Sequence, residues 1–182
     1  LFPSAREAYG RGMATAFLPE GMTPDIDRAF EHMWPNIGSA LDDRADRFPD
    51  QTGWMFPNAH GDWQEMSWDR FRSWVHQVAA GLFALGVKPG EVASICSGTS
   101  IRWVVADLAM STVGITTNTI YPNTRVDDVR FILDDADAVA VFVQNTAIAQ
   151  KIIEASAGSD RIRTIIVMEG KADIADPRVM TW

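Results

Sequence analysis

The segment Ser97-Gly98-Thr99-Ser100 comes nearest in residue type to a phosphate-binding loop. Its small residues stand between an apolar run and a predicted helix, where backbone N–H groups attract anions. A phosphate loop needs more glycine and a lysine, as in G-x-x-x-x-G-K-[ST] or G-x-G-x-x-G, and the segment fits neither pattern. We therefore expect a helix cap here, at Thr99 or Ser100, rather than a phosphate site.

Histidines and acidic residues indicate neither a metal site nor an acid–base pair. His32, His60 and His76 have no partner at metal-ligand spacing. The acidic turn at residues 134–137 follows the last turn of a predicted helix, where solvated carboxylates lack a pocket that would separate their pKa values. The sequence thus predicts no catalytic residue and no metal ligand.

Composition and charge narrow the class of protein. The chain is 47% hydrophobic and 22% charged, as in an ordinary globular protein. Its net charge of -8 argues against a nucleic-acid partner, which would require a basic surface. The single cysteine, Cys96, lies in an apolar run and is expected to be buried and inert, which favours a reducing cytosol. From this cysteine usage we expect a cytoplasmic protein. No apolar run reaches the roughly 18–20 residues of a transmembrane segment.

Predicted strands and helices alternate from residue 91 to residue 168, and they would position the SGTS segment and the acidic turn. Short apolar runs such as EVASIC and AVAVFV predict strands, and helical stretches of about ten residues separate them. This alternation predicts an α/β fold, with a mostly parallel sheet and helices on both faces. A β-hairpin is expected at residues 52–67. We divide the chain into an extended, irregular N-terminal arm (residues 1–34) and an α/β subdomain (residues 35–182).

Apolar stripes predict which face of each helix is buried. A helix over residues 36–48 carries the stripe Ile37, Leu41, Ala45 and Phe48. The helix after the SGTS segment is expected to bury Ile101, Val104, Val105, Leu108 and Thr112. Ser67 is the expected N-cap of the long helix that follows it, and Gly86 the expected left-handed C-cap.

The loop Tyr121-Pro122-Asn123-Thr124 follows a predicted strand and supplies the candidate cofactor-binding residues. Ligands of parallel sheets usually lie in a crevice at the carboxyl ends of the strands. Tyr121, Asn123 and Thr124 are therefore the positions that we expect to meet a ligand. The alternative is a plain turn in which Thr124 serves as the N-cap of the next helix, in a T-x-x-D pattern.

Three stretches carry a resemblance to a known family. They are SWDRFRSWVHQVAAGLFALGVKPGEVASI, IRWVVADLAMSTVGITTNTIYP and FPDQTGWMFP. In order and spacing they resemble the N-terminal part of the acyl-adenylate-forming enzymes, in particular the AMP-forming long-chain fatty acid–CoA ligases. The resemblance spans roughly residues 34–145. Trp68 departs from the tyrosine that is more usual in the family, a modest change if the ring only packs.

The resemblance implies that the chain opens a much larger, multi-layer α/β enzyme. Such an enzyme uses ATP to convert a fatty acid to an acyl-AMP with release of pyrophosphate, and then passes the acyl group to CoA. Its phosphate loop, its magnesium-binding residues and its catalytic lysine normally lie further along the chain. We accordingly expect ATP, CoA and Mg²⁺ in the whole enzyme and none of them bound to this piece. The resemblance also implies that the loop with Tyr121, Asn123 and Thr124 faces the nucleotide part of CoA.

Both ends of the chain predict a fragment. It begins with Leu1, and its last residues, DPRVMTW, resemble the start of a further element. The expected partner is the remainder of the same polypeptide, with a fatty acid as substrate. Apolar faces that the missing layers would cover are expected to drive self-association into a homo-oligomer. Peripheral membrane association of the whole enzyme is left open.

Two alternatives stay open at this point. The acid can be of another class within the same superfamily, such as an aryl or amino acid. The chain can also be a free-standing α/β module that binds a nucleotide or a protein.

Overall fold

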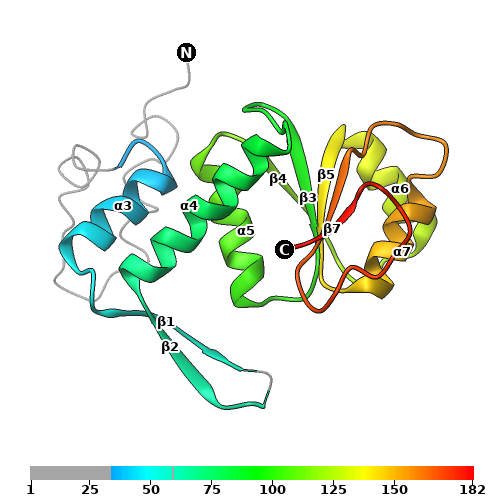
Figure 1. Cartoon of the computed structure of the whole chain (residues 1–182). Coiled ribbons are helices and arrows are strands. Elements are labelled where there is room, and N and C mark those ends of the chain that lie inside the picture. Colours follow the sequence, from blue (N-terminus) through cyan, green and yellow to red (C-terminus); the bar gives the residue numbers. More distant parts are fainter. Residues whose placement is uncertain (1–33, 59) are drawn as a thin grey trace, which may run out of the picture. The chain divides into compact units, whose positions relative to one another are not determined.

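The computed structural model describes residues 34–58 and 60–182. The arm predicted for residues 1–34, together with His32, therefore lies outside the described residues, apart from Trp34. The described part contains a parallel sheet, a separate hairpin and five helices. Figure 1 shows the elements in chain order.

The centre of the structure is a five-stranded sheet with the strand order β4-β3-β5-β6-β7. Its strands are β3 (Val92–Cys96), β4 (Thr116–Ile120), β5 (Ala138–Val143), β6 (Thr164–Val167) and β7 (Val179–Thr181). All neighbouring pairs run parallel. The inner strand β5 is almost continuously apolar, as expected for a strand that is covered on both faces. The predicted parallel sheet is confirmed.

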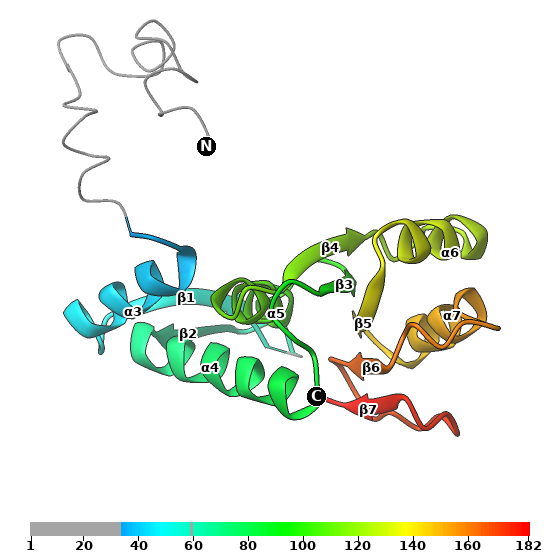
Figure 2. The ribbon, with the colours of Figure 1, turned by 90° about the horizontal axis from the view of Figure 1, so that it is seen from above.

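Helices cover both faces of the sheet, as predicted. On one face, α6 (Val126–Asp135) and α7 (Thr146–Ala155) pack Leu133 and Ile152 against strand residues. On the other, α4 (Trp68–Ala84) and α5 (Ile101–Thr112) pack Leu82 and Met110 onto the sheet. Figure 2 shows the two helix pairs on opposite sides of the strands.

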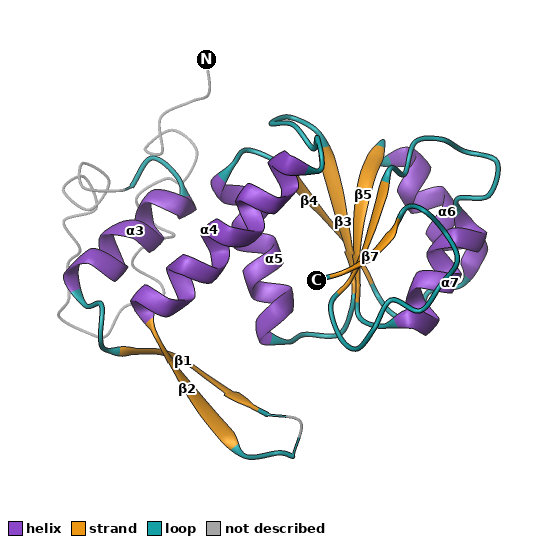
Figure 3. Ribbon diagram, viewed as in Figure 1, coloured by secondary structure: helices purple, strands orange, loops and turns teal. Residues whose placement is uncertain are grey.

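A further group of elements lies on the outer side of α4 and α5. Helix α3 (Ile37–Arg47) and the antiparallel hairpin of β1 (Thr52–Pro57) and β2 (Trp63–Ser67) form it. The hairpin is separate from the main sheet (Figure 3). It is anchored by Trp54, whose ring lies 4.8 Å from that of Phe71 on α4. The hairpin predicted at residues 52–67 is confirmed.

The caps predicted for α4 are confirmed. The side chain of Ser67 accepts a hydrogen bond from the backbone N–H of Arg70. Gly86 has a φ of 77°, the left-handed conformation that favours glycine at a helix end. The tail residues predicted to begin a new element form β7, which adds a parallel strand to β6 at the edge of the sheet.

The buried faces of two helices differ from the predicted stripes. On α5, Ile101, Val104, Leu108 and Thr112 are only half-buried, and Val105, Ala106, Ala109 and Met110 are the buried residues. This helix packs on two sides, with Ala106 and Met110 toward the sheet and Val105 and Ala109 toward α3 and α4. A single stripe cannot describe a helix that lies between two layers.

On α3, Ile37 is 50% exposed rather than buried. Gly38 is buried in its place, and a Cβ added there would lie 3.0 Å from the side chain of Thr112. The close approach of α3 to α5 thus uses glycine, which a search for large apolar residues does not detect.

The N-cap predicted at Thr124 is wrong. The cap of α6 is Arg125, whose side chain makes no capping hydrogen bond. Asp127 and Asp128 occupy the first turn, where their charge is favourable next to the free N–H groups. Thr124 instead belongs to the preceding turn.

Candidate functional site at the carboxyl edge of the sheet

The carboxyl ends of β3, β4 and β5 bring three loops to one edge of the sheet. Ser97–Ser100 follows β3, Tyr121–Arg125 follows β4, and Gln144 with Asn145 follows β5. In parallel sheets this edge is the usual ligand side. It is also where the sequence placed the candidate cofactor-binding residues.

Tyr121, Asn123 and Thr124 lie together in a tight turn, closed by a 3.0 Å hydrogen bond from the Thr124 N–H to the Tyr121 carbonyl. Pro122 occupies the second position, where its fixed φ favours a turn. The Tyr121 side chain is 81% exposed, Asn123 is exposed and Thr124 is half-buried. The three predicted residues are thus adjacent and accessible, while their contact with CoA remains a prediction.

The Ser97–Ser100 segment is a helix cap, as predicted. Ser100 accepts a 3.2 Å hydrogen bond from the N–H of Trp103, so Ser100 and not Thr99 is the capping residue. Buried Ser97 donates a 2.8 Å hydrogen bond to the carbonyl of Gly98. The Ser97 and Ser100 side chains are thus occupied by hydrogen bonds to the backbone, and the segment contains no lysine that would reach a phosphate.

A polar bridge across the edge was missed in the sequence. The Gln144 side chain accepts a hydrogen bond from the Gly98 N–H (3.3 Å) and donates one to the carboxylate of Glu169 (3.4 Å). Gln144 follows the last residue of β5, and Glu169 lies two residues beyond the end of β6. Looking for the first polar residues after each strand would have found both, since these positions meet at one edge.

Lys151 and Cys96 lie behind the turn and were also not linked to it in the sequence. The Lys151 ammonium, on α7, donates hydrogen bonds to the carbonyls of Pro122 (2.6 Å) and Thr124 (3.0 Å). The Cys96 sulfur lies 3.9 Å from the carbonyl oxygen of Tyr121 and is fully buried. Burial raises the pKa of the Cys96 thiol to about 11, and the charge of Lys151 opposes that shift. The thiol is therefore protonated at neutral pH, as expected for an inert cysteine.

No metal site is found among the described residues: no group of three or more histidine, cysteine or carboxylate side chains is placed to hold an ion. His76 lies on α4 with its Nε2 3.1 Å from a carboxylate oxygen of Asp42. In the acidic turn, Asp137 pairs with Arg161 at 2.8 Å on the surface. The predicted surface role of that turn is confirmed.

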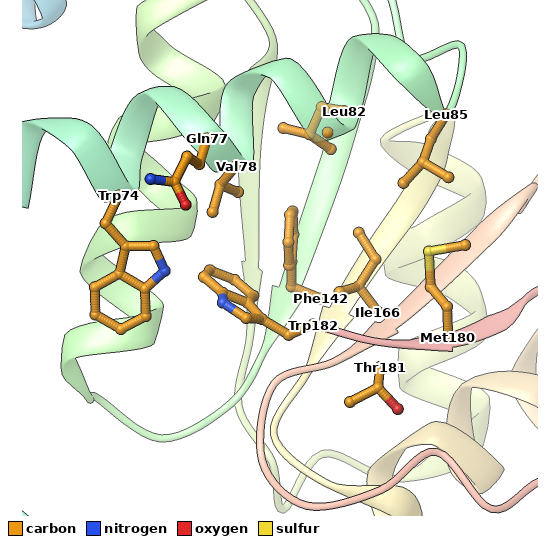
Figure 4. A pocket seen from close by; sticks show the side chains of 11 residues that line it. Trp74, Gln77, Val78, Leu82, Leu85, Phe142, Ile166, Met180, Thr181 and Trp182 are labelled. Atoms are coloured by element: carbon orange, nitrogen blue, oxygen red, sulfur yellow. The ribbon is translucent and has the colours of Figure 1, made fainter.

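A hollow, here called the apolar groove, lies between α4 and the strands β5, β6 and β7. It has a volume of about 310 Å³. Figure 4 shows its lining side chains, of which the apolar ones are Trp74, Val78, Leu82, Leu85, Phe142, Ile166, Met180 and Trp182. None of these described lining residues is titratable, so the groove is suited to packing rather than to chemistry.

None of the helices within residues 34–58 and 60–182 has both the length and the hydrophobicity of a membrane-spanning segment.

Parallel α/β sheets with an accessible carboxyl edge commonly bind ligands at that edge. Comparison with known families shows which family of such proteins this chain belongs to. Residues 41–179 match the family model described as AMP-binding enzyme. Because the match covers most of the chain, the protein belongs to the AMP-binding enzyme family. The family resemblance drawn from the sequence is confirmed.

Curated relatives are mostly acid–CoA ligases. The chain is 29% identical over 119 residues to the long-chain-fatty-acid–CoA ligase FadD15 of Mycobacterium bovis, covering 65% of this chain and 20% of the ligase. It is 32% identical over 128 residues to the 3-[(3aS,4S,7aS)-7a-methyl-1,5-dioxo-octahydro-1H-inden-4-yl]propanoyl:CoA ligase of Mycobacterium tuberculosis, covering 69% of this chain and 23% of that ligase. The chain thus spans about a fifth of the length of these ligases.

A shorter relative is also found. The uncharacterized protein Rv1549 of Mycobacterium tuberculosis is 26% identical over 107 residues, which is 59% of this chain and 59% of that protein. Among solved structures, acetoacetyl-CoA synthetase from Streptomyces lividans has a TM-score of 0.67 at 22% identity, covering 81% of this chain and 24% of that one. At this identity the likeness shows the fold.

Proposed function

We propose that this chain is the opening part of a longer AMP-forming fatty acid–CoA ligase, called here the parent enzyme. The parent enzyme would join a fatty acid to ATP as an acyl-AMP, release pyrophosphate, and transfer the acyl group to CoA. The observation that carries this proposal is a family match over residues 41–179 in a chain that spans only 20% of FadD15.

In this proposal the 182 residues supply scaffold, and the reacting groups are encoded further along. The described carboxyl edge has turns, caps and a polar bridge, and its loops hold no pair of nucleophile and base. ATP, CoA and Mg²⁺ would act in the parent enzyme, which we place in the cytoplasm. The reading frame beyond Trp182 tests the proposal directly. A Ser/Thr/Gly-rich loop followed by lysine is expected there, and a stop codon directly after Trp182 would contradict it.

A fatty acid is the substrate that we favour, because FadD15 is named as a long-chain-fatty-acid ligase. A polycyclic acid is the second candidate substrate. The chain is 32% identical to the indenyl-propanoyl:CoA ligase, slightly more than the 29% to FadD15. Assaying the parent enzyme against fatty, aryl and polycyclic acids separates the two. Preference for the polycyclic acid would overturn the fatty-acid assignment while leaving the ligase chemistry intact.

We also propose that the turn with Tyr121, Asn123 and Thr124 faces the nucleotide part of CoA in the parent enzyme. Its support is position: the turn lies at the carboxyl edge, and Tyr121 presents an 81% exposed ring on which a base can stack. Tyr121→Ala in the parent enzyme is expected to raise the KM for CoA and to leave the KM for ATP unchanged. An unchanged KM for CoA would contradict this role.

The apolar groove fits the proposed scaffold role. A later segment of the parent polypeptide is the occupant that we propose, since the ligases matched here are about five times longer than the matched part. In the isolated chain Trp74 and Trp182 line an open groove, their rings 6.0 Å apart. This arrangement supports the expectation that the isolated chain self-associates.

The competing function is that of a free-standing module. The observation that favours it is Rv1549, which the chain matches over 59% of its length and which is therefore of similar size. Calorimetry of the 182-residue chain with ATP, AMP and CoA discriminates the two. Micromolar binding of one nucleotide would favour the module, and the absence of binding supports the scaffold.

A further inference from the structure

Lys151 connects two parts of the structure that are far apart in sequence. It lies on α7, and its ammonium group donates to the carbonyls of Pro122 and Thr124 at 2.6 and 3.0 Å, 29 and 27 residues away. These carbonyls flank Asn123 on either side. The ammonium group thus binds the turn through two carbonyls, and two contacts fix the orientation of the turn as well as its position.

The charge of Lys151 is matched by these carbonyls rather than by an acid. None of the ion pairs formed between described residues includes Lys151. The side chain is half-buried, whereas Lys88 and Lys171 are exposed. Removing a cation partly from water is costly unless hydrogen bonds replace the lost hydration. The two hydrogen bonds to carbonyls therefore offset the cost of partly burying the Lys151 ammonium.

The space behind the turn is occupied by Cys96. Its sulfur lies 3.9 Å from the Tyr121 carbonyl oxygen, and its exposed fraction is 0%. Cys96 is the only cysteine of the chain. Cys96 belongs to the core cluster under α6 and α7, and it contacts the turn through the Tyr121 carbonyl. Displacement of the turn is therefore expected to increase the access of a thiol reagent to this one position.

We propose that Lys151 is a positioning residue that holds the turn of Tyr121, Asn123 and Thr124 in place at the carboxyl edge and so fixes how these three side chains are presented to CoA. The presentation to CoA rests on the proposed function. The holding of the turn does not, and it can be measured in the isolated chain.

The first experiment measures opening of the turn. Amide exchange is followed at Thr124, whose N–H closes the turn, and at Ile165 in β6, together with the rate at which Cys96 reacts with a disulfide reagent. In Lys151→Met we expect Thr124 exchange and Cys96 reaction to accelerate about tenfold or more, because the variant loses both hydrogen bonds and the loss of one charge-assisted hydrogen bond already accounts for about tenfold. Ile165 exchange should stay unchanged, which separates local opening from global unfolding.

Two further variants complete this experiment. Lys151→Arg retains a donor for the carbonyls and is expected to restore most of the protection. Lys171→Met removes an exposed lysine and is expected to behave like the unaltered chain. Equal rates at Thr124 in Lys151→Met and the unaltered chain would overturn the proposal, as would acceleration at Thr124 and Ile165 alike.

The second experiment uses the parent enzyme. Lys151→Met is expected to raise the KM for CoA about tenfold, with the rate of ATP–pyrophosphate exchange unchanged and with rescue by Lys151→Arg. A turn that opens in the isolated chain without any change in the KM for CoA would confirm the holding role of Lys151. It would at the same time contradict the CoA-facing role of the turn.

Discussion

Gly53 in β1 faces the indole ring of Trp68 so closely that a Cβ at Gly53 would lie 2.8 Å from Cδ2 of Trp68. Trp68 also packs edge-on against Phe71, with 6.5 Å between the ring centroids. The indole ring of Trp68 is therefore accommodated by the absence of a side chain at position 53. The hairpin and α4 meet through this contact.

Gly53→Ala is expected to destabilise the chain by about 1–3 kcal/mol, because the indole must shift in a packed layer. Gly81→Ala is the matched control. It lies on an exposed part of α4 with nothing within 4 Å of the added Cβ, and is expected to stabilise by about 0.5–1 kcal/mol. Urea unfolding measures both. A Gly53→Ala chain as stable as the unaltered one would contradict the packing described.

The ion pair of Asp176 and Arg178 is expected to make the segment before β7 sensitive to acid. Arg178 binds both carboxylate oxygens, at 3.0 and 2.8 Å, and donates to Ser156 at 3.1 Å. These hydrogen bonds hold the pKa of Asp176 below its ordinary value of 3.8. The pair therefore stabilises the fold fully above about pH 3.8, and this contribution is lost as the pH falls through the lowered pKa.

Asp176→Asn removes the charge and tests that pH dependence. Above the ordinary pKa of 3.8, the variant should be less stable than the unaltered chain by about 1–3 kcal/mol, because Arg178 keeps a half-buried charge without its partner. The difference should shrink as the pH falls below 3.8 and through the lowered pKa of Asp176. Urea unfolding at a series of pH values gives both curves, and a difference independent of pH would contradict the prediction.

Much of the fold could be predicted from the sequence, because strands and helices here have distinct periods. The continuous run from Ala138 to Val143 and the caps at Ser67 and Gly86 are local signals, and the structure contains them as expected. The stripes on α3 and α5 were less predictable. The exposure of Ile37 and the burial of Ala106 depend on which other elements pack against each helix. The residues of one helix do not carry that information.

The candidate site was predictable only in part. Position in the chain placed Tyr121, Asn123 and Thr124 at the end of a strand, and the structure brings them into one turn. Lys151 was not predictable, since its contact spans 27 to 29 residues and depends on how α7 packs beside α6, which follows the turn. The T-x-x-D pattern predicted an N-cap at Thr124. Thr124 instead closes the tight turn, and the helix begins at Val126.

Burial of Cys96 predicts how its ionisation and the stability of the chain depend on pH. Its pKa is raised from 9.0 to about 11, so the ultraviolet absorbance of its thiolate in the folded chain, taken as the difference from Cys96→Ala, should have its midpoint near pH 11. Between these values the unfolded chain loses the proton and the folded chain keeps it, so stability falls as the pH rises. The difference in unfolding free energy between the unaltered chain and Cys96→Ala, measured as a function of pH, gives the contribution of Cys96 ionisation to stability. A midpoint near 9 would contradict the burial described.

Self-association is expected to proceed through the apolar groove. Met180→Glu places a charge among the lining residues and should reduce the concentration-dependent mass seen by light scattering. Phe131→Glu is the control, since Phe131 is 69% exposed on α6 and lies outside the groove. A clean monomer of the unaltered chain at all concentrations would contradict the prediction, as would equal loss of association in both variants.

We propose that these 182 residues are scaffold for a ligase whose reacting groups lie elsewhere in its sequence. The most direct test of this proposal is release of pyrophosphate from ATP by the purified chain with a fatty acid, Mg²⁺ and CoA present. We predict no release above the rate without protein. Sustained turnover, abolished by a substitution at the carboxyl edge such as Gln144→Ala, would contradict the account.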